Sequence, residues 1–316
     1  MLIKKNTLSI LKILVVIFLL PVAHLSALAQ NAKICLFVPE TFVSDAIRKE
    51  FKSEGYTNVI DDAVQLNELA EYFSSVKPDI VIVDGSGLAT IDKQLEYESK
   101  VISYAFANHV DRLLLLSSYD IYTQRAHPLS ESLLSEKALH AASNPYAVAK
   151  LSGLSKCRSL NDPEKPKFML CIYPMLYGKN DPKCAPKTAH PLYQIIDRIA
   201  TADRENRKFT VITNDGSALY DVLHVDDFAK AVVQVVQGPY QYEIVNVSSG
   251  IDHSVKTFTS LVKRSSDYTG EVILDVNCYD AVQRRVLDNR RIQELGWTPT
   301  ILLQEGLQDT YKWYRK

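Results

Sequence analysis

Residues 113–122 read Leu-Leu-Leu-Leu-Ser-Ser-Tyr-Asp-Ile-Tyr, and this stretch decides the fold. Its first part, Leu113–Leu116, is a short apolar run typical of a strand buried on both faces of a parallel sheet. Ser117 and Ser118 follow directly and bring hydroxyl groups to the carboxyl end of that strand. Because open α/β sheets bind ligands beyond this edge, the stretch predicts a strand that ends in a functional site.

The chain around this strand alternates between short apolar runs and longer helical segments. We expect further strands at Ile34–Val38, Ile80–Val83 and Phe168–Tyr173, and helices at Val43–Gly55, Lys93–Asn108 and Tyr146–Ser159. Strands separated by helices form right-handed βαβ units and a parallel sheet. The sequence therefore predicts an α/β fold with a doubly wound, Rossmann-like parallel sheet.

The C-terminal third has a mixed pattern. We expect short strands with intervening helices there, the strands at Phe209–Ile212, His224–Val236, Tyr242–Val247 and Val272–Val276. No Gly/Ser linker, internal repeat or low-complexity tract interrupts residues 33–316, so the two lobes should pack together. We expect a Rossmann-like dinucleotide-binding domain over residues 30–178. A smaller, mixed α/β substrate lobe should follow over residues 179–316, with strands that return to the main sheet.

A tyrosine and a lysine one helical turn apart form a second chemical signal, Tyr146-Ala-Val-Ala-Lys150. Side chains at positions i and i+4 share a helix face, and a nearby ammonium favours the phenolate. Tyr146 could then exchange a proton with a carbinol or carbonyl near neutral pH. Taken alone, such a pair is more often a packing pair with a solvated lysine head. The order of strand, hydroxyl, loop and YxxxK motif is much more specific.

Several stretches together carry a resemblance to a known family. They are residues 113–122, Asn144-Pro-Tyr-Ala-Val-Ala-Lys-Leu-Ser-Gly153, Leu176-Tyr-Gly178, Leu223-His-Val-Asp-Asp-Phe-Ala-Lys-Ala231, Asn246-Val-Ser-Ser-Gly-Ile-Asp-His-Ser254, Leu295-Gly-Trp-Thr-Pro299 and residues 306–314. Over residues 33–316 the chain resembles the extended short-chain dehydrogenases/reductases, the NAD-dependent epimerase/dehydratase family. Within that family it is most similar to the GDP-L-fucose synthases.

The resemblance implies a nucleotide-sugar substrate and NADPH/NADP as cofactor. The GDP-L-fucose synthases convert GDP-4-keto-6-deoxy-D-mannose to GDP-L-fucose by epimerising two ring carbons beside the ketone and then delivering hydride from NADPH. Ser118 is implied to polarise the C4 ketone, and Tyr146 to donate the proton at that oxygen. Lys150 is implied to lower the tyrosine pKa and to hold the nicotinamide ribose. Homodimers are usual in this family, so we expect a homodimer.

Two further residues are implied to act in epimerisation. His190 matches the family's epimerisation acid, and the near-neutral pKa of histidine suits that role. The alternative is a loop histidine before Pro191 with no special role. Asp120 stands where the family pairs that histidine with a cysteine. A carboxylate can act as a base toward an acidified C–H, although Asp120 could equally be a loop cap.

The other implied site residues contact the cofactor or the substrate. The cofactor contacts are Val38, Thr41, Phe42, Val43, Ser117, Lys150, Met175 and His190. The substrate contacts are Arg198, Tyr220 and either Arg284 or Arg285. Arginine forks suit pyrophosphate, although lone arginines usually face solvent. The family has an asparagine where this chain has Met175 and an arginine where it has Tyr220.

The loop after the first strand departs most from the family. A GxxGxxG triplet normally allows a tight turn and close approach to the pyrophosphate, but this chain has Val38, Thr41 and Ser44 at those positions. Glu40 adds negative charge beside the phosphates. We therefore expect weak NADPH binding. Two alternatives stay open: a catalytically impaired homologue that binds a nucleotide sugar or a protein partner, and a related nucleotide-sugar epimerase or dehydratase.

The first 29 residues differ from the rest of the chain. Lys4 and Lys5 precede an apolar run over Ile13–Val22, and Ala27-Leu-Ala29 follows. A basic start, an apolar core and an A-x-A site are typical of a signal peptide, so we expect an exported or membrane-anchored protein. The alternative is a mis-chosen start codon upstream of a cytoplasmic enzyme.

Composition and charge exclude several classes of protein. With 47% hydrophobic and 23% charged residues, the 316-residue chain can bury a full core. A net charge of −1 argues against a nucleic-acid-binding protein. The five cysteines contain no CxxC pair, so we expect neither a metal site nor a complete disulfide framework.

Overall fold

The computed structural model describes most of the chain after the N-terminal segment. The described residues are 29–39, 41–86, 88–123, 127–135, 137, 142, 144–181, 191–239, 241–279 and 284–315, without the side chain of Thr41. Residues 1–28 of the expected signal segment, together with Glu40 and His190, lie outside them. Within these ranges, no helix combines the length and the hydropathy needed to span a bilayer.

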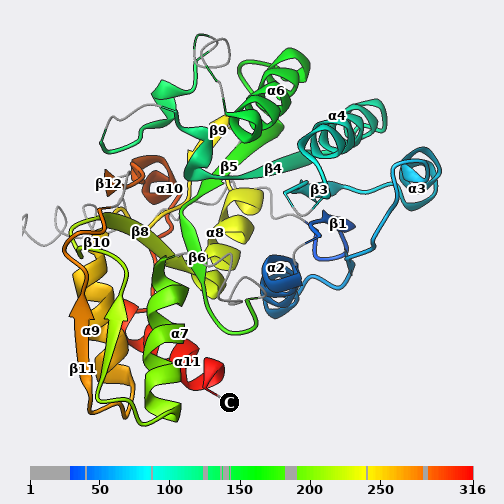
Figure 1. Ribbon diagram of the computed structural model, residues 1–316. Helices are drawn as coiled ribbons and strands as arrows, with labels where there is room; N and C mark the ends of the chain where they lie inside the picture. The colour runs from blue at the N-terminus through cyan, green and yellow to red at the C-terminus, as the bar shows by residue number, and fades with distance from the viewer. Residues whose placement is uncertain are drawn as a thin grey trace, which may run out of the picture.

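A six-stranded, fully parallel sheet lies at the centre of the molecule (Figure 1). In spatial order its strands are β2 (Val59–Ile60), β1 (Ile34–Phe37), β3 (Ile80–Val83), β4 (Arg112–Ser118), β5 (Phe168–Tyr173) and β9 (Ile244–Asn246). The order reverses between β1 and β3, and open α/β sheets bind ligands at the carboxyl ends beside such a reversal. The predicted doubly wound α/β class is confirmed.

Alternating side chains along each strand explain why the sheet is buried on both faces. On β4, Leu113 and Leu115 join one hydrophobic core, and Leu114 and Leu116 join the other. The first core includes helices α3 (Leu69–Val76), α4 (Ile91–Ala107) and α6 (Pro145–Leu160). The second includes α2 (Thr41–Ser53) and α8 (Val225–Gln237) (Figure 1). Because both faces are covered by helices, the strands are continuously apolar.

A smaller lobe adds two further sheets and a group of helices. Its strands are β6 (Met175–Tyr177), β7 (Phe209–Ile212), β8 (Leu219–His224), β10 (Asp252–Ser254), β11 (Glu271–Leu274) and β12 (Arg284–Arg285). Its helices are α7 (Pro191–Arg204), α9 (Val255–Ser265), α10 (Arg290–Glu294) and α11 (Leu303–Tyr314). Strand β8 pairs with β6, β10 and β12, whereas β7 pairs with β11. Helices α7, α9 and α11 pack together beside the β7–β11 pair, at the lower left of Figure 1.

The expected strand over His224–Val236 is wrong, because His224 ends β8 and the residues after it form helix α8. The His224 side chain caps the helix by accepting the Asp226 N–H at 3.2 Å, and Asp226 and Asp227 occupy the first turn. The helix is buried along most of its length and is rich in valine. A buried helix and a buried strand have similar composition, so the acidic first turn is the feature that distinguishes them.

Asp221 on β8 connects the smaller lobe to the central sheet. Its buried carboxylate accepts hydrogen bonds from the hydroxyls of Ser248 and Ser249, which follow β9. It also accepts the N–H of Leu287 at 3.3 Å. Burial raises the pKa of Asp221 to about 7, although these hydrogen bonds oppose the shift. The side chain therefore joins segments that are far apart in the sequence.

We predict that Asp221→Ala lowers the free energy of unfolding by about 3 kcal/mol, because it removes the acceptor of the buried Ser248 hydroxyl and of the Leu287 N–H and one acceptor of the half-buried Ser249 hydroxyl. Urea denaturation followed by circular dichroism measures the loss. Asp267→Ala is the control, because Asp267 forms an exposed ion pair with Arg315 and its removal should cost less than about 1 kcal/mol. Equal losses in the two variants would contradict the prediction.

Candidate active site

Two serines end strand β4 at the carboxyl edge of the sheet. Ser117 is buried and Ser118 is half-buried. After Ser118 the chain turns through a short 3-10 helix, Tyr119–Ile121, whose first turn is capped because Ser118 Oγ accepts the Asp120 N–H at 3.2 Å. The Ser118 hydroxyl donates in turn to the Asp120 carboxylate, also at 3.2 Å. This local cap fixes both serines at the point where the strand leaves the sheet.

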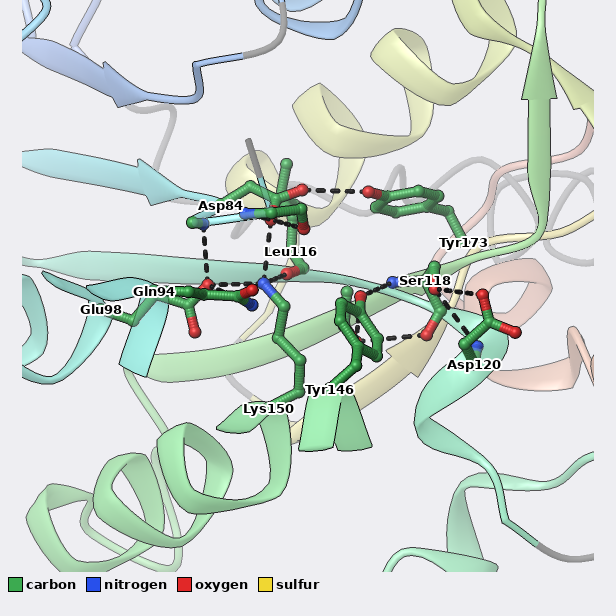
Figure 2. A network of polar contacts seen from close by, with 12 residues as sticks. Asp84, Gln94, Glu98, Leu116, Ser118, Asp120, Tyr146, Lys150 and Tyr173 are labelled. Carbon is green, nitrogen blue, oxygen red and sulfur yellow. Dashed lines mark hydrogen bonds and ion pairs between the residues drawn. The ribbon is translucent and has the colours of Figure 1, made fainter. Parts of the chain in front are cut away.

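The start of helix α6 fixes the position of Tyr146. Asn144 caps the helix by accepting the Tyr146 N–H at 3.0 Å, and Pro145 occupies the first helical position. The Tyr146 hydroxyl accepts the Ser118 N–H at 2.8 Å and lies 3.3 Å from the Ser117 hydroxyl. Figure 2 shows the Tyr146 ring directed at the end of β4. The structure thus brings the tyrosine of the YxxxK motif to the predicted serines.

Lys150 points into a cluster of buried carboxylates (Figure 2). Its ammonium donates to Asp84 Oδ1 at 2.9 Å, to Glu98 Oε1 at 2.5 Å and to the carbonyl oxygen of Leu116 at 2.8 Å. The Lys150 side chain has no exposed surface. All three of its N–H bonds go to protein acceptors, so a ribose hydroxyl would have to displace one of them.

The two carboxylates are themselves held in place. Asp84 follows β3 directly and accepts the Tyr173 hydroxyl at 3.0 Å and the Ser86 N–H at 2.9 Å. Glu98 lies within α4 and accepts the Gly85 N–H at 2.7 Å. Neither residue is among those predicted from the sequence. Asp84 could have been found from the sequence, because it directly follows a buried strand. The two serines were predicted from the same feature.

The cluster balances the charge of Lys150. Burial disfavours the ammonium, but Asp84 and Glu98 reverse that effect and raise the pKa of Lys150. Burial also opposes ionisation of Asp84, yet the Lys150 charge and the Ser86 hydrogen bonds hold the pKa of Asp84 below its usual value. The pKa of Glu98 is raised by burial. The ammonium is therefore shared between two carboxylates instead of acting on the phenol alone.

Tyr146 keeps its proton at neutral pH. Burial raises the pKa of its hydroxyl, and the opposing effect of Lys150 is smaller. Lys150 does lower the pKa of Tyr146, as expected, but this effect is smaller than the rise caused by burial, so the net pKa is raised. Burial is the main cause of the raised pKa, and the negative charge of Asp84 adds to it.

Two neighbouring arginines of β12 lie in different environments. Arg285 forms an ion pair with Asp120, and its guanidinium lies 5.1 Å from the centroid of the Tyr119 ring. Arg284 instead pairs with Asp252, with 2.5 Å between Nε and Oδ2. Of the two candidates for substrate binding, Arg285 is therefore the one beside the Ser118–Asp120 turn.

The remaining sequence-predicted residues are spread over several elements. Met175 is buried at the start of β6, and Tyr220 is buried in β8. Arg198 is exposed on α7. His190 and the side chain of Thr41 lie outside the described residues.

A cavity of about 630 Å³ opens at the carboxyl ends of β1, β2 and β3. Val38 and Ser44, two of the residues at expected glycine positions, line it. Phe42 and Val43 are buried beneath the same loop. The cavity lies at the reversal of the strand order, and its volume is within the range of small-molecule sites.

Comparisons with known proteins indicate the family of this chain. A model of the NAD dependent epimerase/dehydratase family matches residues 49–248. The chain is 30% identical over 305 residues to a putative GDP-L-fucose synthase 2 from Arabidopsis thaliana, covering 91% of this chain and 93% of that protein. It is 28% identical over 299 residues to the GDP-L-fucose synthase of Escherichia coli K12, covering 86% and 93%.

Solved structures share the fold. A GDP-L-fucose synthetase from Naegleria fowleri matches with a TM-score of 0.78 and 16% identity, over 91% of this chain and 94% of that one. Its form bound to NADP matches with a TM-score of 0.74 and 16% identity, over 90% and 94%.

We predict that Lys150→Met lowers the free energy of unfolding by about 3–5 kcal/mol, because it leaves two buried carboxylates without their cation. Replacing both carboxylates as well, by Asp84→Asn and Glu98→Gln, should restore part of the loss. Urea denaturation measures each variant. The control is Lys100→Met, since Lys100 makes an exposed ion pair with Glu96. A loss for Lys150→Met no larger than for this control would show that the buried cluster does not stabilise the fold.

Proposed function

The chain belongs to the NAD-dependent epimerase/dehydratase family, and we propose that it is a nucleotide-sugar epimerase and reductase like the GDP-L-fucose synthases. In this proposal it converts GDP-4-keto-6-deoxy-D-mannose to GDP-L-fucose with NADPH. Relatives that carry the synthase name and align over about nine-tenths of the chain support it. Incubation of the purified protein with this substrate and NADPH, followed by mass spectrometry and sugar analysis of the product, tests it.

The contact between the Tyr146 hydroxyl and the end of β4 is the observation that carries the proposal. The C4 oxygen of the sugar needs a proton in the reductive step, for which bound NADPH would supply the hydride. Tyr146 holds that proton at neutral pH, because burial raises its pKa. The Ser117 hydroxyl lies 3.3 Å from the phenol, and the Ser118 hydroxyl, bonded to Asp120, belongs to the same strand end; both are proposed to hydrogen-bond to the C4 oxygen. After transfer, the Ser118 N–H at 2.8 Å stabilises the tyrosinate.

A nicotinamide dinucleotide fits the cavity at the carboxyl ends of β1–β3 in place and in size. NADP(H) is the cofactor that the homologous synthases and the NADP-bound synthetase indicate. Val38 and Ser44 carry side chains where glycine would let the backbone approach the pyrophosphate, so fewer backbone hydrogen bonds can form. The protein is expected to bind the dinucleotide weakly for this reason.

Asp120 is the proposed base for epimerisation. Its carboxylate accepts the Ser118 hydroxyl at 3.2 Å and is ion-paired with Arg285. The ring carbons beside a ketone carry acidified C–H bonds, from which a carboxylate can remove a proton. His190 remains the proposed acid for the return of that proton.

We also propose that the protein forms a homodimer. Export, or a membrane tether through residues 1–29, is a further part of the proposal.

We predict that Tyr146→Phe lowers the turnover of NADPH oxidation by about 10²–10⁴-fold, because it removes the proton donor. The rate is measured from the fall in NADPH absorbance with GDP-4-keto-6-deoxy-D-mannose as substrate. Tyr279→Phe removes the same atom from an exposed ring and should leave turnover unchanged. A Tyr146→Phe enzyme as fast as this control would rule out the phenol as proton donor.

We predict that Asp120→Asn slows epimerisation separately from reduction. In D₂O, the rate at which deuterium enters the ring carbons beside the ketone should fall about 10²-fold or more, because the base is lost. Mass spectrometry of the sugar measures the exchange. Asp252→Asn, in the neighbouring carboxylate–arginine pair, is the matched control. Undiminished exchange in Asp120→Asn, or equal losses in both variants, would contradict the assignment.

A further inference from the structure

The cavity at the carboxyl ends of β1–β3 has an acidic wall where β2 ends. Asp61 and Asp62 follow β2 directly and line the cavity on that side. Lys93 and Glu96, both from α4, are the other charged residues of the described lining. The described lining therefore carries three carboxylates and one ammonium, and it contains no arginine.

Both aspartates are held by side chains from other elements. Ser44 on α2 hydrogen-bonds to the side chain of Asp61. The hydroxyl of Tyr72 on α3 donates to Asp62 Oδ2 at 3.3 Å. Arg48, whose charge acts on Asp61, is itself ion-paired with Asp45 on the same helix. The wall is thus a fixed pair of carboxylates without a free guanidinium beside it among the described residues.

The end of β2 is the position that distinguishes the two nicotinamide dinucleotides in a doubly wound fold. A carboxylate roughly 20 residues after the phosphate loop accepts a hydrogen bond from the adenosine 2′-hydroxyl of NAD, whereas an arginine nearby accommodates the 2′-phosphate of NADP. Asp61 lies at that spacing after Val38, and both residues line the same cavity. A 2′-phosphate placed there would face two carboxylates, and like charges at such distances repel.

We propose that Asp61 accepts the adenosine 2′-hydroxyl and, together with Asp62, disfavours a 2′-phosphate, so that this chain binds NADH at least as tightly as NADPH. The proposal rests on the proposed function, because it takes a nicotinamide dinucleotide to be the hydride carrier. NADP(H) can then still bind, but its 2′-phosphate adds nothing to the affinity.

Equilibrium titration of the purified full chain with NADH and with NADPH, followed by nicotinamide fluorescence, tests the proposal. The expected result is a dissociation constant for NADPH that is equal to that for NADH or higher. NADPH binding tenfold tighter than NADH overturns the inference and leaves the proposed function standing. If neither nucleotide binds at millimolar concentration, the inference and the reductase half of the proposed function both fail.

Charge variants at the wall make the test specific. Asp61→Arg should raise the affinity for NADPH relative to NADH about tenfold or more, because a guanidinium fork can bind the phosphate. Asp61→Asn, which keeps the shape of the side chain but removes its charge, should shift the ratio in the same direction by a smaller factor. Glu54→Arg makes the same charge reversal on an exposed residue beyond the far end of α2 and should leave the ratio unchanged. An unchanged ratio in both Asp61 variants overturns the proposal.

Discussion

Burial of the Lys150 ammonium is the constraint on which the site depends. From α6 this side chain reaches the carboxylate of Asp84 after β3, the carboxylate of Glu98 on α4, and a backbone carbonyl of β4. Withdrawing an ammonium from water costs several kcal/mol unless acceptors surround it, so the four elements must keep their relative positions while the lysine is buried. Strand β4 and helix α6 also carry Ser118 and Tyr146. The contact that stabilises this part of the fold therefore also sets the geometry of the reacting groups.

The charge balance around Lys150 determines what Tyr146 can do. A free ammonium beside a phenol favours the tyrosinate, which is the base that alcohol oxidation requires. Here two carboxylates share the ammonium, and burial raises the pKa of Tyr146 instead. A protonated phenol suits ketone reduction, in which the oxygen must receive a proton. Burial and the negative charge of Asp84 thus keep the tyrosine protonated, although Lys150 acts in the opposite direction.

Sequence patterns predicted the sheet and the hydroxyl groups but not the charge cluster. Apolar runs identify β1, β3, β4 and β5 because strands buried on both faces tolerate few polar residues. The partners of Lys150 are 66 and 52 residues away in the sequence, so only the packing of β3 and α4 against α6 brings them together. The valine-rich helix α8 has the composition of a strand and differs from one mainly in its capped, acidic start. The choice between Arg284 and Arg285 depends on which face of β12 each residue occupies, since successive side chains of a strand point to opposite faces.

The loop between β1 and α2 contributes to the core as well as to the cavity. Val38, Phe42 and Val43 are at most 6% exposed and belong to the core that joins the sheet to α8. A buried side chain of this kind contributes on the order of 1.5–3 kcal/mol relative to an exposed one, so glycine at Val38 would give up packing that needs no cofactor. The side chains of this loop and of the start of α2 thus stabilise the first βα unit by themselves. A dinucleotide must then be held by the walls of the cavity more than by the backbone of the loop. For that reason the charges of Asp61 and Asp62 affect the relative affinity for NADH and NADPH more than they would beside a glycine-rich loop.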